Sequence, residues 1–109
     1  MQILLDENVP QKLRLLIEGH SVVTTAFRGW SGLKNGDLID VAENAGIELL
    51  ITADQEIQYQ QNLISRKIGL LVLNTNNWIV IESHVTEIVA AIKTAAPGRC
   101  IRLELTAQG

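Results

Sequence analysis

The sequence predicts one α/β domain over residues 1–109, with three layers in which helices cover both faces of a mainly parallel sheet. Short aliphatic runs alternate with helical patterns along the chain, which is typical of sheets built from strand–helix–strand units. Two of these runs, at 3–5 and 69–73, contain no polar side chain, as expected of strands buried on both faces. A chain of 109 residues is the size of one domain.

The first half of the chain contains two expected strands. The apolar run at 3–5 is followed by apolar residues at helical spacing over 9–17, and Gly19 supplies the end signal of that helix. The β-branched run at 21–25 predicts the second strand. Three glycines and an asparagine make 27–36 a loop.

The second half contains three more strands. Its elements are expected as a helix from about 35–37 to 46, a strand at 47–51, a polar helix at 55–63, a strand at 69–73, a long helix after 74–77 and a strand at 101–105. The last strand alternates apolar with charged residues, so it should form a half-exposed edge. The common order of such sheets, 2-1-3-4-5, places the first strand beside the third and the C-terminal strand at an edge.

Composition excludes several classes of protein. The hydrophobic share of 47% and the charged share of 19% are those of a globular domain rather than a disordered chain. A net charge of −3 argues against coating nucleic acid through bulk positive potential. The single Cys100 excludes an internal disulfide and a cysteine-based zinc cluster. With no run near the roughly 20 residues of a membrane span and no secretion leader, we expect a cytoplasmic protein without membrane contact.

Acidic residues follow the strands that should be adjacent. Asp6 and Glu7 come directly after the first strand and Asp54 after the third, while Asp37 opens the helix between the second and third strands. The carboxyl ends of parallel strands share one sheet edge, where open α/β sheets bind ligands. A helix cap is the simpler reading of each acid, but Asn8 is available as a cap after the first strand.

Carboxylates gathered in this way repel one another unless some are protonated or a cation lies between them. No Lys or Arg is close in sequence to Asp6 or Asp54. Oxygen ligands suit Mg²⁺ or Mn²⁺, and such ions typically assist phosphate chemistry. The expected metal ligands are the following residues: Asp6, Asp54, Asp37, Glu7 and Glu56.

Several short motifs occur in series: Leu-Leu-Asp-Glu-Asn-Val-Pro at 4–10, Gly-His-Ser-Val-Val-Thr at 19–24, Gly-Asp at 36–37, Leu-Ile-Thr-Ala-Asp at 50–54 and Leu-Val-Leu at 71–73. In this order the chain resembles the small PIN-like proteins, which are akin to the PIN ribonuclease toxins of bacterial toxin–antitoxin modules. The resemblance extends to about residue 90. It implies a PIN-like fold and a Mg²⁺- or Mn²⁺-dependent ribonuclease with Asp6, Asp37 and Asp54 as catalytic acids.

The resemblance also implies a small DNA-binding antitoxin as partner, and a homodimer is a further expectation. The chain departs from the family at one motif. Where the family continues Thr-x-Asp-x-Asp-Phe, this sequence has Glu56 and Ile57 in the last two positions. A glutamate can still bind a metal, but its longer side chain changes the geometry. The loss of the aromatic residue at position 57 leaves open a weakened or altered site.

The loop before Asp37 contains the expected RNA-binding residues. Arg28 and Lys34 could contact phosphates, and Trp30 could stack on a base. The alternative is that Trp30 packs on the domain's own surface or across a dimer.

Two other functions fit the same pattern. A receiver-type phosphoacceptor domain would use Asp6 and Glu7 as its acid pair, Asp54 as the acceptor and Thr75 as the hydroxyl. It also needs a lysine after the fifth strand, and the only basic candidates, Arg99 and Arg102, do not lie beyond that strand. A PIN-like interaction module without activity is the third reading.

Overall fold

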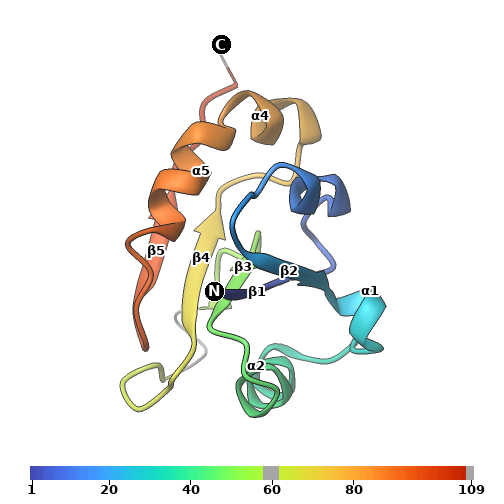
Figure 1. The fold of residues 1–109 in the computed structure, drawn as a ribbon, viewed down its shortest axis with the longest axis vertical. Helices are drawn as coiled ribbons and strands as arrows, with labels where there is room; N and C mark the ends of the chain where they lie inside the picture. The colour runs from blue at the N-terminus through green and yellow to red at the C-terminus, as the bar shows by residue number, and fades with distance from the viewer. Residues whose placement is uncertain (58–61, 108–109) are drawn as a thin grey trace.

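The structure, a computed structural model, describes residues 1–57 and 62–107. One sheet contains β1 (Gln2–Leu5), β2 (Ser21–Thr24), β3 (Leu49–Thr52), β4 (Gly69–Leu73) and β5 (Cys100–Leu103). Its order is β2-β1-β3-β4-β5, and every neighbouring pair is parallel (Figure 1). The predicted α/β class, the strand order and the C-terminal edge strand are therefore confirmed.

Helices cover both faces of the sheet. They are η1 (Gln11–Leu15, a 3-10 helix), α1 (Thr25–Arg28), α2 (Asn35–Asn44), α4 (Trp78–Ser83) and α5 (Val85–Ile92). Figure 1 shows η1, α4 and α5 on one side of the strands and α2 on the other. None of the helices within the described ranges is long and apolar enough to cross a membrane.

The two halves of the core follow from the alternation of side chains along each strand. Ile3 and Leu5 of β1 pack in the cluster under η1, α4 and α5, whereas Leu4 packs in the cluster over α2. Because both faces of the inner strands are covered, β3 and β4 are buried along their whole length. Continuous aliphatic runs are the sequence signature of that arrangement.

Two expected helices have different geometry. Around 9–17 the chain forms η1, since the N–H groups of Leu13 and Leu16 donate to carbonyls three residues earlier, at 3.1 and 3.0 Å. The long helix expected after 74–77 is divided into α4 and α5 at His84, whose φ of −118° leaves the helical region. Its ring contacts Glu87 and the carbonyl of Thr106, which holds this break against the C-terminal segment.

Part of the expected loop at 27–36 is helical. Thr24 ends β2 and its hydroxyl accepts the N–H of Phe27 at 3.1 Å, so α1 begins directly after the strand. Gly29, with φ of 74°, ends this single turn. Residues 58–61 of the polar helix expected at 55–63 lie outside the described residues, and residues 62–63 at its expected end are not helical.

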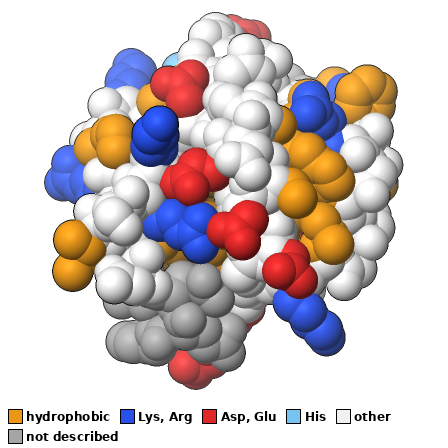
Figure 2. All heavy atoms as spheres, turned by 90° about the horizontal axis from the view of Figure 1, so that it is seen from below, with side chains coloured by type: hydrophobic (Ala, Val, Ile, Leu, Met, Phe, Trp, Pro, Cys, Tyr) orange, Lys and Arg blue, Asp and Glu red, His pale blue; other side chains and the backbone are white. Residues whose placement is uncertain are grey.

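A group of charged side chains joins α2 to the segment before β4. Arg66 contacts Asp40 at 2.6 Å and Glu43 at 3.1 Å. Figure 2, which views the molecule from the α2 side, shows acidic and basic side chains next to one another on this face. The charges here compensate each other, which distinguishes this face from the sheet edge described next.

Candidate functional site

The hydroxyl of Thr52 connects the ends of β1 and β3. It donates to Asp6 Oδ2 at 2.8 Å and accepts the backbone N–H of Asp54 at 3.1 Å. Thr52 is the last residue of β3 and is fully buried, and Leu5, just before Asp6, pairs with Ile51. The parallel register therefore holds the two acids at one sheet edge through a single side chain, as predicted from the strand order.

Asn8 strengthens the same connection rather than capping a helix. Its Oδ1 accepts the N–H of Ala53 at 3.0 Å, and its Nδ2 lies 3.4 Å from Thr52 Oγ1. No side chain caps η1, which begins after Pro10. The sequence interpretation of Asn8 as a cap is therefore wrong, because its amide crosses to the neighbouring strand end.

Asp6 is an acid in an unfavourable electrostatic environment. Its side chain accepts the N–H of Glu7 at 2.8 Å, besides the Thr52 hydroxyl, and the residue is 8% exposed. Burial raises the pKa of Asp6, the two hydrogen bonds lower it, and repulsion from Glu7 and Asp54 raises it again. The net shift of the pKa is upward, because loss of solvent disfavours the charged form more than the hydrogen bonds favour it.

Asp54 is more accessible and is held from two sides. Its Oδ1 accepts the N–H of Glu56 at 3.0 Å, and its Oδ2 accepts the side-chain amide of Asn35 at 2.6 Å. Since Asn35 is the first residue of α2, this contact attaches the start of α2 to the end of β3. The acid thus lies between two elements that are distant in sequence.

An opposite edge strand supports the segment after Asp54. Arg102 of β5 donates to the backbone carbonyl of Gln55 at 3.2 Å and to its side-chain oxygen at 2.9 Å. The side-chain amide of Gln55 in turn donates to the carbonyls of Ala53 and Leu73. These contacts fix the backbone on either side of Asp54.

A cleft of about 510 Å³ opens beside Asp54 and Glu7. Its lining residues are Glu7, Gly32, Leu33, Lys34, Asn35, Gly36 and Asp54. Glu7 Oε1 accepts the N–H of Gly32 at 3.3 Å, so the loop before α2 closes one side of the cleft. The lining contains both acidic and basic side chains, in a space large enough for a nucleotide-sized ligand.

The five expected metal ligands are only partly brought together. Asp6 lies within range of repulsion from Glu7 and from Asp54. Asp37 is an exposed residue in the first turn of α2, and Glu56 is also exposed. Among the described residues, no group of three or more His, Cys, Asp or Glu side chains has the geometry to hold a metal ion.

The expected RNA-binding residues are divided between two positions. Lys34 lines the cleft. The guanidinium of Arg28 stacks on the ring of Trp30, with 4.6 Å between its carbon and the ring centroid, and Trp30 packs against the core cluster over α2. The alternative interpretation of Trp30, as a residue packed on the domain's own surface, agrees with this placement.

Sequence reasoning missed three contributions to this site. The sequence motif at 50–54 assigns no role to Thr52, although a hydroxyl at the end of a central strand can reach the neighbouring strand end. Asn35 and Arg102 gave no signal in the sequence, because their contacts with Asp54 and Gln55 span 19 and 47 residues.

Fold and site together define a single-sheet, all-parallel α/β protein with two acids and a cleft at the carboxyl ends of β1 and β3. Comparison with protein-family models, with curated proteins and with solved structures gives no match to this chain.

Proposed function

We propose that the protein is a Mg²⁺- or Mn²⁺-dependent ribonuclease of the PIN-like type. The observation that carries this proposal is the pair of acids joined by Thr52: Asp6, with a raised pKa, lies near Asp54. No ion pair to Asp6, Glu7 or Asp54 occurs within residues 1–57 and 62–107. A protein that keeps like charges together without a counter-charge gains stability when a cation binds between them.

The donor set fits a magnesium-type ion held by two carboxylates. Each carboxylate oxygen can accept two hydrogen bonds, so oxygens that already accept one from Thr52, Glu7, Glu56 or Asn35 keep a lone pair for a metal. Mg²⁺ is commonly bound by one or two carboxylates, with water and substrate phosphate completing its shell, so a group of three acids is not required. When bound, such an ion activates water and stabilises charge on the leaving oxygen.

The other residues of the cleft have roles consistent with this chemistry. Lys34 lines the cleft and can pair with a phosphate of the RNA backbone, and Glu7, which also lines it, can accept a proton or hold a water molecule. Asp37 and Glu56 remain proposed ligands on the strength of the resemblance. The same resemblance supports the further proposal of a toxin component with a small DNA-binding antitoxin as partner, while the single cysteine supports a cytoplasmic location.

The test is cleavage of single-stranded RNA with and without metal. We expect cleavage with Mg²⁺ or Mn²⁺, none in EDTA, and a loss of roughly 100-fold or more in Asp6→Asn. Glu18→Gln, which alters an exposed acid, is the matched control and should retain full activity. Cleavage that persists in EDTA, or an active Asp6→Asn protein, would contradict the proposal.

The receiver-type alternative is favoured by the strand order and by an acid after β3. Two contacts weigh against it. The hydroxyl of Thr75 accepts the N–H of Asn77 within its own turn, at 3.1 Å, and Arg102 lies inside β5 with its guanidinium on Gln55. Incubation with acetyl phosphate followed by mass spectrometry separates the two functions, because only a receiver domain forms a stable phosphoryl adduct on Asp54. A protein that neither cleaves RNA nor accepts phosphate would support the inactive interaction module.

A further inference from the structure

The edge strand β2 has a free hydrogen-bonding side. It pairs with β1 alone, and the N–H of Ser21 donates to Met1 O at 3.0 Å, so Ser21 directs its backbone groups toward β1. Successive residues of a strand direct these groups to opposite sides, which leaves the N–H and C=O of Val22 pointing outward. Among the described residues, these groups have no protein partner.

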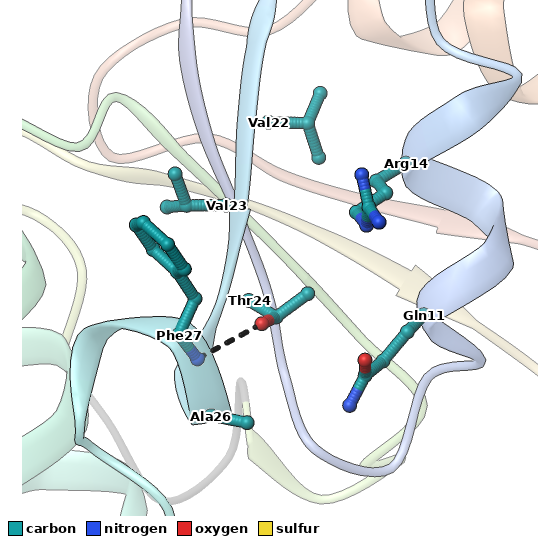
Figure 3. A pocket seen from close by; sticks show the side chains of 7 residues that line it. All are labelled: Gln11, Arg14, Val22, Val23, Thr24, Ala26 and Phe27. Carbon is teal, nitrogen blue, oxygen red and sulfur yellow. Dashed lines mark hydrogen bonds between the residues drawn. The ribbon is translucent and has the colours of Figure 1, made fainter.

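A groove of about 550 Å³ lies along this free side. Figure 3 shows that η1 borders it with Gln11 and Arg14, while α1 borders it with Ala26 and Phe27. The two strand residues Val22 and Val23 point to opposite borders and pack against the two separate core clusters. The groove therefore has a backbone edge as its floor and two chemically different walls.

The side chains that border the groove differ from those that merely prevent an edge strand from pairing with another strand. Phe27 is 80% exposed, and a large aromatic left in water beside an open edge favours contact with another apolar group. Arg14 is exposed and forms no ion pair with any described residue. Protected edges usually present charge without apolar surface, whereas this edge presents an apolar wall opposite a positive one.

We propose that this groove binds an extended segment of another protein, which adds a sixth strand to the sheet beside β2. Side chains alternate along such a segment, so every second one faces Phe27 and Val23 and is apolar, and those between face Arg14 and are acidic. Backbone hydrogen bonds to Val22 supply part of the affinity, and the two walls select the sequence. The partner is thus an acidic–apolar alternating strand.

A second copy of this chain fits the groove less well. Two β2 strands could pair antiparallel about a twofold axis normal to the sheet. The two sheets would then form one continuous sheet, with the corresponding faces of both copies on the same side. Both Arg14 side chains would then lie on one face of a short four-residue contact, where like charges repel. An acidic segment from a different protein removes that repulsion and pairs the free arginine.

The inference is independent of the proposed nuclease. No residue lines both this groove and the acidic cleft. Failure of RNA cleavage therefore says nothing about strand addition, and failure of strand addition says nothing about the nuclease.

The probe is a capped peptide of alternating valine and glutamate, with a lysine-for-glutamate peptide as its charge control. Titration followed by amide NMR should shift the signals of Val22 and Thr24 and slow hydrogen exchange at Val22. We expect the lysine peptide to bind at least about tenfold more weakly than the glutamate peptide, and Arg14→Glu to reverse that preference. A glutamate peptide N-methylated at every second amide should lose binding, because it cannot pair with the strand edge.

Two matched variants complete the test. Phe27→Ser should weaken binding of the glutamate peptide about tenfold, whereas Ile79→Ser, at an equally exposed apolar position on α4, should leave it unchanged. Circular dichroism verifies that both variants are folded. Equal binding of the glutamate and lysine peptides, binding that survives N-methylation, or shifts that spare β2 and the two groove walls would overturn the proposal. So would a dimer in sedimentation that Phe27→Ser dissolves, since the occupant would then be a second copy.

Discussion

Glu43 and Asp6 are both largely enclosed carboxylates, but their surroundings are opposite. Glu43 accepts the N–H groups of Lys67 and Ile68 with one oxygen and the guanidinium of Arg66 with the other. Burial alone would raise the pKa of Glu43, but these hydrogen bonds outweigh burial and lower it. Asp6 has two neutral donors and two acidic neighbours, and its pKa is raised.

The difference separates a structural acid from a candidate site. The bonds to Glu43 attach α2 to the start of β4, and its negative charge is balanced inside the protein by Arg66. The negative charge of Asp6 is balanced by no described basic residue, although Thr52 and Glu7 hold the carboxylate in place. A carboxylate that is positioned but not neutralised is suited to a cation from outside.

The largest expected effect is the response to metal. Mg²⁺ at 100 times its dissociation constant should raise the free energy of unfolding by about 2.7 kcal/mol, and the melting temperature by roughly 10 °C. Asp6→Asn and Asp54→Asn should respond far less, because each removes one of the two proposed ligands. Glu43→Gln should respond like the parent, although it starts from a lower stability. A parent protein without any response to Mg²⁺ or Mn²⁺ would remove the distinction between the two acids.

The second effect is loss of the structural acid. Glu43→Ala leaves two backbone N–H groups without their acceptor and Arg66 with Asp40 alone, and should lower the free energy of unfolding by about 2 kcal/mol in urea denaturation. Asp40→Ala is the matched control. It removes the other carboxylate that contacts Arg66. Because the Asp40 side chain is exposed, the free energy of unfolding should change by roughly 0.5 kcal/mol or less. Equal losses in the two variants would mean that the backbone bonds of Glu43 contribute little.

The third effect concerns the bridge between the strand ends. Thr52→Val keeps the shape of the side chain but removes the donor to Asp6 and the acceptor of the Asp54 N–H, so we expect a loss of about 1.5 kcal/mol at neutral pH. Thr52→Ser keeps the hydroxyl and should retain the response to Mg²⁺. If Thr52→Val binds Mg²⁺ as tightly as the parent, the bridge does not position the acids.

How far the sequence predicted these regions depends on the range of the contacts. The aliphatic runs identify the strands, and the strand at 69–73 is found with its predicted bounds, because burial on both faces leaves a continuous apolar signal. The strand order then predicts that Asp6 and Asp54 are neighbours. The break at His84 was missed, because helical periodicity continues across it, while the residue that His84 contacts there, Thr106, is 22 residues away.

The site was predicted less completely for the same reason. Topology brings strand ends together, but the position of Asp37 depends on how α2 begins, and there Asn35 rather than Asp37 contacts Asp54. The Glu43 cluster gave no signal at all, since an acid in a helix usually faces solvent. Its partners lie in the segment before β4, more than twenty residues away.

The smallest expected effect is the pH dependence of stability, where the two acids should act in opposite directions. The folded-state pKa of Asp6 lies above 3.8, so the folded protein binds more protons than the unfolded chain between pH 3.8 and that pKa. Stability from this group therefore falls as the pH rises through that window. The folded-state pKa of Glu43 lies below 4.5, so its contribution is present above pH 4.5 and is lost as the pH falls through the folded value.

Urea denaturation from about pH 3 to about pH 7 measures both contributions. The stability of Asp6→Asn relative to the parent should increase as the pH rises, because the variant lacks the group that becomes unfavourable when charged. The stability of Glu43→Gln should instead approach that of the parent as the pH falls, because the parent then loses the contribution of the charged Glu43 carboxylate, which the variant lacks. Parallel curves for Asp6→Asn and the parent would mean that Asp6 titrates alike in the folded and unfolded chain. Burial and the repulsion from Glu7 and Asp54 would then not disfavour the charged form of Asp6, and the case for a cation at this sheet edge would be lost.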